Sequence, residues 1–291
     1  MKKPIFKGVG TAIITPFSGG EIDYGALDAL IERQIGAGVG ALVVGGTTGE
    51  AATLSDSERY ELFQRAREAV GGRARLIFGT GTNDTRVAIR HTEEAQRVGC
   101  DGVLLVTPYY NRGTEEGLYR HYRAIMDSTS LPAILYNVPS RTGVTLPLTT
   151  VERLADDYGG IAIKEASDSQ DRLAALAAMP DVTLYAGNDA ATYTVLALGG
   201  AGVISVVSNL YPSDMQEVCK LFFTKKRQKS LEKLKTLLPV INSLFLETNP
   251  APIKYAMAKM GFCTPEMRLP MWLPTERTRT KIDAAIAAYE K

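Results

Sequence analysis

Lys164 is the residue whose surroundings most strongly suggest chemistry. It stands in an apolar run, Gly160-Ile161-Ala162-Ile163-Lys164-Glu165-Ala166, that is typical of a buried strand. Burial disfavours the ammonium form, lowers the pKa of a lysine and leaves a neutral amine that can act as a nucleophile. A plainer interpretation is a lysine at a strand end that reaches water or pairs with Glu165. Taken alone, the run favours this plainer interpretation.

Polar groups follow three other apolar runs. Gly45-Gly46-Thr47-Thr48-Gly49-Glu50 would let backbone amides approach a small anion, or would form a simple turn in which Thr48 caps a helix. The tyrosines of Thr107-Pro108-Tyr109-Tyr110-Asn111 are either packing residues or proton carriers. Arg141, in Tyr136-Asn137-Val138-Pro139-Ser140-Arg141-Thr142-Gly143, is either a surface cation or a fork for a carboxylate.

The residue types that are scarce narrow the chemistry further. The two histidines, His91 and His121, both fall in helical patterns, which disfavours a metal-dependent aldolase or hydrolase. No GxSxG or Cys/His pattern supports acyl transfer. A lysine nucleophile, tyrosine and threonine hydroxyls for proton transfer and an arginine for a carboxylate together suit Schiff-base chemistry on a 2-oxo acid. The expected covalent link at Lys164 needs neither a metal nor a separate cofactor.

The elements that must position these groups alternate along the chain. Apolar runs and helical patterns recur roughly every 25–35 residues up to about residue 223, which predicts a parallel sheet covered by helices. About eight such units fit an α/β (β/α)8 TIM barrel over residues 1–224. The alternative, an open doubly wound sheet, lacks a GxGxxG after its first strand. The predicted strands cover residues 8–14, 41–45, 76–79, 102–106, 133–136, 161–164, 182–186 and 202–206.

The alternation stops after residue 224. Residues 225–291 are expected to form a C-terminal helical region packed on the barrel and not a separate domain. Its charge run at 225–229 is interpreted as a solvated helix face, because nucleic acid is a poor alternative for a chain of net charge +1. Asn249-Pro250-Ala251-Pro252 predicts a turn and a helix start, and residues 276–289 predict a last helix.

Composition sets the remaining limits. The 291 residues are 45% hydrophobic, which is enough for a large core. No signal peptide or membrane span is predicted, because no long apolar stretch follows the N-terminal lysines. Cys100, Cys219 and Cys263 are widely spaced and odd in number, which indicates a reducing compartment and a cytoplasmic protein.

The motifs quoted above, with Gly202-Val203-Ile204-Ser205-Val206, jointly resemble those of the dihydrodipicolinate synthase family, within the superfamily that includes N-acetylneuraminate lyase. The resemblance covers essentially the whole chain. It implies a lyase that condenses pyruvate with aspartate semialdehyde to 4-hydroxy-tetrahydrodipicolinate, on the route to lysine and diaminopimelate. It also implies a homotetramer built from two tight dimers, or a homodimer.

The resemblance also implies residue roles. Lys164 would form the Schiff base, and Tyr136 would be the general acid and base. Thr48 and Tyr110 would complete a hydroxyl relay, with Tyr110 serving the partner's site across the tight dimer. For substrate binding, the amides of Thr47 and Thr48 would hold the pyruvate carboxylate. The other implied substrate-binding residues are Arg141, which would bind the carboxylate of the semialdehyde, Gly187, and Ile204 through its carbonyl.

Arg141 discriminates between the superfamily's reactions, because a sugar-acid lyase would want hydroxyl-binding groups there. A sugar-acid lyase or aldolase, of the N-acetylneuraminate or ketodeoxygluconate type, is therefore the alternative function. A non-catalytic 2-oxo-acid sensor is a third hypothesis, against which the complete set of reactive side chains argues.

Many members of the family are inhibited by lysine at the dimer interface. The resemblance places a possible effector site at Ala51, Asp56, Asn83 and Tyr109. Val87 stands where a glutamate would bind the effector's ammonium, and Asp56 and Arg59 stand where histidines are common. Because an ammonium loses a charged partner at Val87, we predict weak or no inhibition by lysine.

Overall fold

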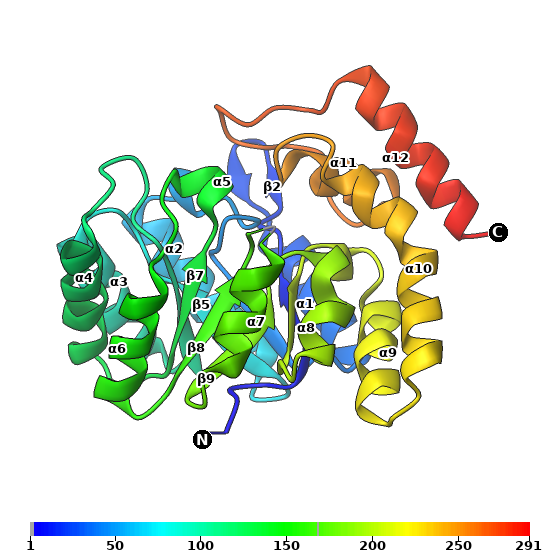
Figure 1. Cartoon of the computed structure of the whole chain (residues 1–291). Helices are drawn as coiled ribbons and strands as arrows, with labels where there is room; N and C mark the ends of the chain where they lie inside the picture. Colours follow the sequence, from blue (N-terminus) through cyan, green and yellow to red (C-terminus); the bar gives the residue numbers. More distant parts are fainter. Residues whose placement is uncertain (1–2, 168) are drawn as a thin grey trace.

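Eight parallel strands close into a barrel in the computed structural model, which describes residues 3–167 and 169–291 (Figure 1). Met1 and Lys2, at the N-terminal stretch considered above, lie outside the described residues. Strand β1 pairs with β10 on one side and with β4 on the other, so the sheet closes. The predicted (β/α)8 barrel is confirmed, and the open sheet is wrong. The strands are β1 (Gly8–Ala12), β4 (Ala41–Val44), β5 (Arg75–Gly79), β6 (Gly102–Val106), β7 (Ala133–Asn137), β8 (Ile161–Glu165), β9 (Val182–Ala186) and β10 (Gly202–Ser205).

The strands are apolar on both faces because each face meets a different core. In β4, Leu42 and Val44 belong to the large core between strands and helices, whereas Ala41 and Val43 point into the barrel. This alternation follows from the two-residue period of a strand. It places every second residue at a strand's C-terminal end inside the barrel mouth, where side chains can meet.

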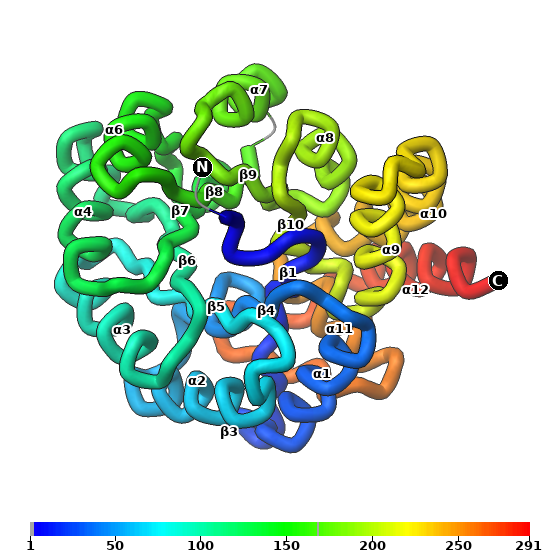
Figure 2. Tube along the Cα trace, turned by 90° about the horizontal axis from the view of Figure 1, so that it is seen from below, coloured from blue at the N-terminus to red at the C-terminus, as the bar shows by residue number. Residues whose placement is uncertain are grey.

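The bottom of the barrel is closed by aromatic rings. Phe6 stacks on Tyr185 with ring centroids 4.4 Å apart, and both side chains are buried. The Tyr185 hydroxyl donates to the Phe6 carbonyl oxygen and accepts from the Phe6 amide. Figure 2 shows the N-terminal segment crossing this end of the barrel. The cavity that contains Lys164 lies at the other end, where the C-terminal ends of the strands meet.

The barrel helices begin and end at residues suited to those places. Asp23, Asp84 and Thr114 accept hydrogen bonds from the first turns of α1, α3 and α4, and Ser55 forms a capping box with Glu58 on α2. The helices are α1 (Tyr24–Gly36), α2 (Asp56–Val70), α3 (Thr85–Val98), α4 (Glu115–Asp127), α5 (Pro139–Thr142), α6 (Leu148–Tyr158), α7 (Gln170–Ala178), α8 (Thr192–Ala197) and α9 (Pro212–Phe223).

Three shorter elements complete the barrel's surroundings. A small hairpin, β2 (Phe17–Ser18) and β3 (Glu21–Ile22), was not predicted. Single 3-10 turns, η1 (Ala51–Thr53), η2 (Asp189–Ala191) and η3 (Val207–Asn209), follow β4, β9 and β10. They shape the loops at the barrel mouth.

The C-terminal region consists of α10 (Arg227–Leu244), α11 (Ala251–Lys259) and α12 (Glu276–Tyr289). The predicted boundary at residue 224 falls between α9 and α10. Figure 1 shows α10 beside α9 along the barrel, and α11 with its following loop across the barrel mouth. This region therefore covers the end of the barrel at which the reactive side chains gather.

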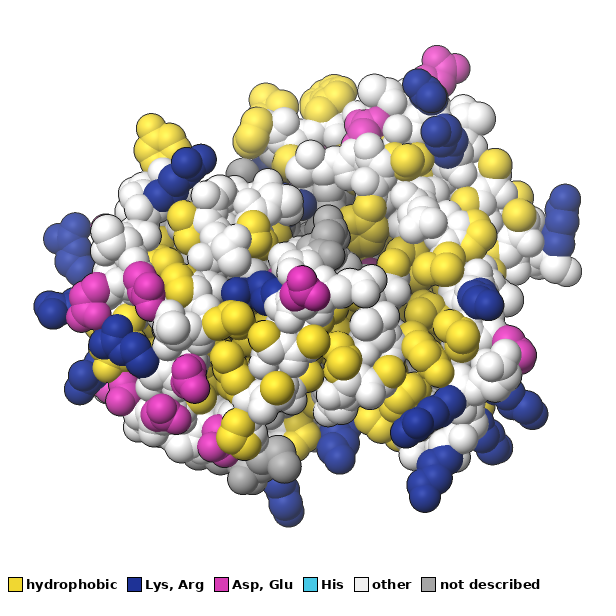
Figure 3. Space-filling model, viewed as in Figure 1, with side chains coloured by type: hydrophobic (Ala, Val, Ile, Leu, Met, Phe, Trp, Pro, Cys, Tyr) yellow, Lys and Arg dark blue, Asp and Glu magenta, His cyan; other side chains and the backbone are white. Residues whose placement is uncertain are grey.

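The surface carries mixed charges (Figure 3). Residues 225–229 are all exposed, which agrees with a solvated face at the start of α10. Leu269 and Trp272, in the loop between α11 and α12, are the most exposed large apolar side chains after Tyr110 among the described residues. None of the helices in residues 3–167 and 169–291 is both long enough and apolar enough to cross a membrane.

Candidate active site

Lys164 and Tyr136 face each other inside the barrel mouth. They occupy paired positions on β8 and β7, and the Lys164 Nζ lies 4.3 Å from the centroid of the Tyr136 ring. Ala162, two residues earlier on β8, points into the same interior core. The strand period therefore turns Lys164 inward, where its side chain is 5% exposed.

Glu165 does not pair with Lys164. The Glu165 carboxylate turns to the outside of the barrel, where the Arg172 Nε donates to it at 2.7 Å. Asn137 Nδ2 donates to the other carboxylate oxygen, also at 2.7 Å. The plainer interpretation of a Lys164–Glu165 pair is therefore wrong, because successive residues of a strand point to opposite faces.

The environment makes Lys164 a better nucleophile. Burial lowers the pKa of Lys164 to about 8; the carboxylate of Asp189 opposes this lowering, and Arg141 adds to it by less than Asp189 opposes it. At pH 7 about one amine in ten is then neutral, against fewer than one in a thousand for an unperturbed lysine. Burial is the largest cause, as expected for a charge removed from water without a contacting counter-ion.

Tyr136 keeps its proton. Burial raises the pKa of Tyr136 to about 12, although Arg141 and a hydrogen bond with the Thr47 side chain oppose the rise. A protonated phenol beside an amine can donate a proton to an oxygen that forms on the reacting carbon. Tyr136 is thus suited to begin a reaction as an acid.

The two threonines of the turn at residues 45–50 have different surroundings, and this corrects the predicted relay. Thr47 contacts Tyr136, whereas the Thr48 hydroxyl accepts a hydrogen bond from Asn249 Nδ2 at 3.0 Å. Thr48 is buried, and it caps no helix, since Ser55 caps α2. The threonine beside Tyr136 is therefore Thr47, where the prediction placed Thr48.

The same turn offers a place for a small anion. The turn's chain reversal begins at Gly45, which has φ +65°, and an added Cβ there would lie 2.8 Å from the Phe63 ring. In the part of the chain that the structure describes, the amides of Thr47 and Thr48 have no hydrogen-bond acceptor. Both residues line a cavity of about 460 Å³ into which Lys164 also points. Two adjacent free amides can bind a carboxylate there.

Arg141 lies at the rim of this cavity, on the short helix α5. Its Nη2 donates to the backbone oxygen of Asn249 at 2.6 Å, and the residue as a whole is exposed. Arg141 lines both this cavity and a second one of about 310 Å³ beside it. A second substrate with a carboxylate could therefore meet Arg141 on its way to Lys164.

Gly187 and Ile204 differ in whether they line the larger cavity. Gly187 lines the larger cavity, as predicted for a pocket residue. Ile204 is fully buried in the interior core and is not among the described residues that line the cavity; Val206, two residues later, lines it instead. Because the predicted contact involves the Ile204 carbonyl and not its side chain, the role of Ile204 stays a prediction.

Tyr110 points away from its own cavity. Its side chain is 91% exposed and its backbone has φ +69°. Tyr110 is not among the described residues that line the larger cavity, whereas Tyr109 lines the smaller one. The structure therefore does not bring Tyr110 together with Lys164 of the same chain.

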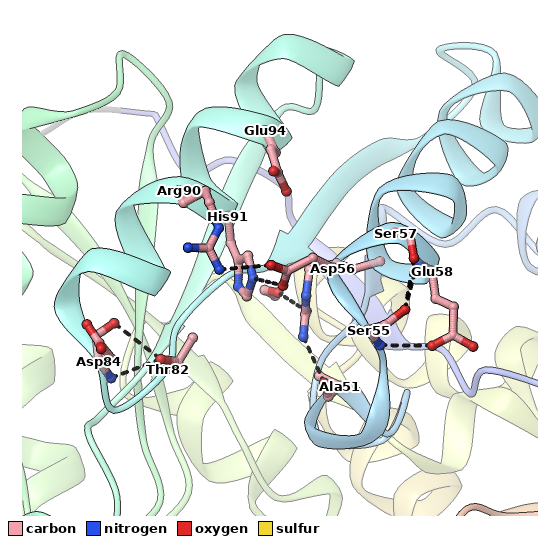
Figure 4. A network of polar contacts seen from close by, with 12 residues as sticks. Ala51, Ser55, Asp56, Ser57, Glu58, Thr82, Asp84, Arg90, His91 and Glu94 are labelled. Atoms are coloured by element: carbon pink, nitrogen blue, oxygen red, sulfur yellow. Dashed lines mark hydrogen bonds and ion pairs between the residues drawn. The ribbon is translucent and has the colours of Figure 1, made fainter.

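Of the four residues of the predicted effector site, two line the smaller cavity and two do not. Ala51 and Tyr109 line the smaller cavity with Arg59, whose Nη2 donates to the Ala51 oxygen at 2.7 Å. Asp56 instead accepts from Arg90 at 2.9 Å and contacts His91 at 3.0 Å, as Figure 4 shows. The Asn83 backbone oxygen accepts from Asn111 Nδ2. Asp56 and Asn83 are not among the described residues that line this cavity.

Sequence reasoning missed two contributors to the site. Asn249 was read only as part of a turn, yet it joins Thr48 to Arg141. Asp189 is 1% exposed, and its Oδ2 accepts from the amides of Val206 and Val207 at the end of β10. The available signal for Asp189 is a polar residue a few positions past a strand end, as for Arg141, since β9 ends at Ala186 and β7 at Asn137.

Comparison with known proteins adds independent information. A model described as the dihydrodipicolinate synthetase family matches residues 5–289. A 4-hydroxy-tetrahydrodipicolinate synthase from Thermotoga neapolitana is 45% identical over 280 residues, which cover 94% of this chain and 95% of the relative. Among solved structures, a dihydrodipicolinate synthase from Thermotoga maritima is 41% identical with a TM-score of 0.96, covering 99% of each chain. One from Cyanidioschyzon merolae with lysine bound is 36% identical, also covers 99% of each chain and has a TM-score of 0.95.

Proposed function

This chain belongs to the dihydrodipicolinate synthetase family, and we propose that it condenses pyruvate with aspartate semialdehyde to 4-hydroxy-tetrahydrodipicolinate, a step of lysine and diaminopimelate biosynthesis. It is a lyase of the Schiff-base-forming type. The observation that carries this proposal is the buried amine of Lys164, without an ion-pair partner among the described residues and 4.3 Å from the Tyr136 ring. No metal or separate cofactor is needed for the steps below.

The first half-reaction fixes pyruvate on the protein. The neutral Lys164 amine attacks the keto carbon, and a C–N bond forms while the oxygen takes a proton from Tyr136. Loss of that oxygen as water takes a second proton, which the lysine nitrogen gives up by way of Tyr136, and leaves an iminium beside a Tyr136 phenolate. The positive nitrogen of the iminium acidifies the neighbouring methyl group. The amides of Thr47 and Thr48 hold the carboxylate and so orient the keto carbon toward Lys164.

The second half-reaction uses the enamine that forms when the Tyr136 phenolate takes a proton from the methyl group, which also restores the Tyr136 hydroxyl. Its carbon attacks the aldehyde carbon of aspartate semialdehyde, and the new alkoxide takes a proton from the Tyr136–Thr47 pair. The amino group of the semialdehyde then attacks the iminium carbon, which closes the ring and releases Lys164 as the amine. Arg141 binds the carboxylate of the semialdehyde during these steps.

Arg141 also favours this reaction over the superfamily's alternatives. A lyase for a polyhydroxylated sugar acid would place hydroxyl-binding groups at the rim instead of a guanidinium. The relatives reported above carry the synthase name, which agrees with the arginine.

Assembly and location complete the proposal. Because Tyr110 is exposed and lies outside its own cavity, we infer that it extends the relay of the partner's site in a tight homodimer, with a homotetramer as the larger assembly. Mixing inactive Tyr110→Phe with inactive Lys164→Ala should restore some activity, because one site of a mixed dimer is intact. No recovery despite subunit exchange would place Tyr110 within its own chain. The cytoplasm is the compartment that the free cysteines favour.

Borohydride trapping tests the mechanism. Pyruvate followed by borohydride should leave one adduct on Lys164, located by peptide mass mapping, and Lys164→Ala should abolish it. Lys259→Ala, which removes an exposed lysine of α11, is the matched control and should leave the adduct intact. An adduct on another lysine of the wild-type protein, or none, would contradict the proposed function.

A further inference from the structure

An ion pair joins the turn at residues 45–50 to the C-terminal region. Lys254 Nζ on α11 lies 2.6 Å from Glu50 Oε1, and the two side chains are 0% and 1% exposed. Attraction in such a pair is offset by the cost of removing both charges from water, so stability alone is a weak reason for it. Its location suggests another role, since Glu50 ends the turn that carries Thr47 and Thr48.

The backbone of Glu50 is held in an unfavourable conformation. Its φ of +53° lies in the left-handed region, which side chains with a Cβ disfavour and which persists only where the surroundings enforce it. Both carboxylate oxygens are held from the C-terminal region: Oε1 by Lys254 and Oε2 by the backbone amide of Arg268 at 3.0 Å. These contacts fix the direction in which the chain leaves the turn.

The conformation of Glu50 is coupled to the free amides. The Glu50 amide donates to the Thr47 carbonyl oxygen at 3.1 Å, and the Ala51 amide donates to Gly46 at 3.2 Å. A rotation at Glu50 would therefore tilt the peptide units that present the Thr47 and Thr48 amides to the cavity. Asn249, in the segment just before α11, fixes the Thr48 hydroxyl from the same side.

We propose that Glu50 and Lys254 are positioning residues for the carboxylate of the 2-oxo acid: their ion pair holds the turn so that the Thr47 and Thr48 amides converge on that carboxylate. Neither residue is among the described residues that line the cavity with Lys164, and the Lys254 Nζ lies 4.3 Å from the centroid of the Phe17 ring. The inference rests on the proposed function, in which these amides bind pyruvate.

Three variants separate positioning from stability. Lys254→Met and Glu50→Gln each leave a buried charge without its partner, so they should lower the melting temperature and raise the pyruvate concentration that half-saturates adduct trapping. The double variant Glu50→Gln/Lys254→Met removes both charges and should recover most of the melting temperature. Its pyruvate half-saturation should stay raised about tenfold or more, because the turn has lost its anchor.

The matched control is Lys259→Met. Lys259 lies on the same helix and forms an ion pair with Asp283 at 2.7 Å, but its side chain is half exposed and its ion-pair partner lies on α12, not in the turn. This variant should keep the wild-type pyruvate half-saturation. A double variant that recovers both the melting temperature and the wild-type half-saturation would overturn the proposal, since the pair would then serve stability only.

Glu50→Asp keeps both charges and covers the case in which the double variant does not fold. The shorter side chain cannot reach Lys254 and the Arg268 amide together without moving the turn, so the half-saturation should rise at least about threefold. An unchanged half-saturation in Glu50→Asp would also overturn the proposal. Failure of the proposed function is distinguishable, because the wild-type protein would then form no adduct at Lys164.

Discussion

The barrel interior and the C-terminal region each bury a lysine, and the two lysines differ in one respect. Lys164 lies 4.3 Å from the Tyr136 ring, and Lys254 lies 4.3 Å from the Phe17 ring. Their exposures are 5% and 0%. Lys254 has the carboxylate of Glu50 at 2.6 Å, whereas Lys164 makes no ion pair with a described residue.

The difference shows what separates a reactive lysine from a structural one. Burial is the largest influence on both amines and lowers the pKa of each. At Lys254 the attraction and hydrogen bond of Glu50, which is in direct contact, oppose this lowering. At Lys164 only the more remote Asp189 opposes it. The contacting partner, more than the degree of burial, therefore decides which lysine can act as a nucleophile.

The largest expected effect comes from removing the unpaired amine. Lys164→Met should abolish the pyruvate adduct and lower turnover about 10⁴-fold or more, because the covalent step has no substitute. The melting temperature should stay the same or rise, since a buried unpaired amine is replaced by an apolar side chain of similar length. Calorimetry with trapping checks both results, and a large loss of stability would contradict the comparison.

Removing the paired amine should have the opposite profile. Lys254→Met leaves Glu50 buried without a counter-charge, which is expected to cost about 3–5 kcal/mol of the free energy of unfolding. The melting temperature should fall by on the order of 10 °C. Mass mapping at saturating pyruvate should still find the adduct on Lys164. An unchanged melting temperature would mean that Lys254 does not need to be charged.

Arg141 tests whether the second substrate has its own anchor. Arg141→Ala should lower turnover of aspartate semialdehyde about 10- to 100-fold, the usual range for losing a charge-assisted hydrogen bond to a carboxylate. Formation of the pyruvate adduct should change much less at a pH above the Lys164 pKa. Equal losses in both steps, measured separately by trapping and by steady-state turnover, would remove the proposed role of Arg141.

The pH dependence of adduct formation measures the Lys164 pKa directly. Only the neutral amine attacks, so the rate should fall about tenfold per pH unit below pH 8 and level off above it. Arg141→Ala removes a positive charge that lowers the Lys164 pKa, so the fall in the rate of adduct formation should move to higher pH. Asp189→Asn removes a charge that raises the pKa and should move it to lower pH. Shifts in the reverse directions would contradict the assignment to Lys164.

The smallest expected effect concerns a third amine, the ammonium of free lysine. A lysine effector would need a carboxylate partner, as Lys254 does, and Val87 cannot supply one. We therefore expect little inhibition of turnover by millimolar lysine, and stronger inhibition in Val87→Glu. An inhibition constant of the wild-type protein in the sub-millimolar range would show that the site binds lysine without that carboxylate.

The barrel could be predicted from sequence because its signals are local. Buried strands and amphipathic helices are periodic over a few residues, and the predicted strands 102–106 and 182–186 match β6 and β9 at both ends. The hairpin β2–β3 was missed, since two-residue strands carry almost no periodicity. Lys164, Tyr136 and Arg141 could be found because each stands at or just past a strand end.

The missed parts of the site depend on contacts that no local pattern records. Thr47 and Thr48 are the same residue type, and only the path of the turn decides which hydroxyl faces Tyr136. Glu50 and Lys254 are 204 positions apart in the chain, as the Glu50–Lys254 hydrogen bond shows. Asn249 meets Thr48 across a similar separation. Such pairs become visible only when the C-terminal region lies over the barrel mouth.

The stacked rings of Phe6 and Tyr185 give the reaction chamber a floor, so that substrates reach Lys164 from the barrel mouth. Substrates and products that share the barrel mouth use it one after another. Pyruvate must be bound to Lys164 before aspartate semialdehyde enters, because the semialdehyde then lies between the bound pyruvate and the barrel mouth. The water released when the Schiff base forms must leave before the semialdehyde fills the barrel mouth. The cyclic product, once released from Lys164, leaves through the same opening. The next pyruvate can bind only after the product has left.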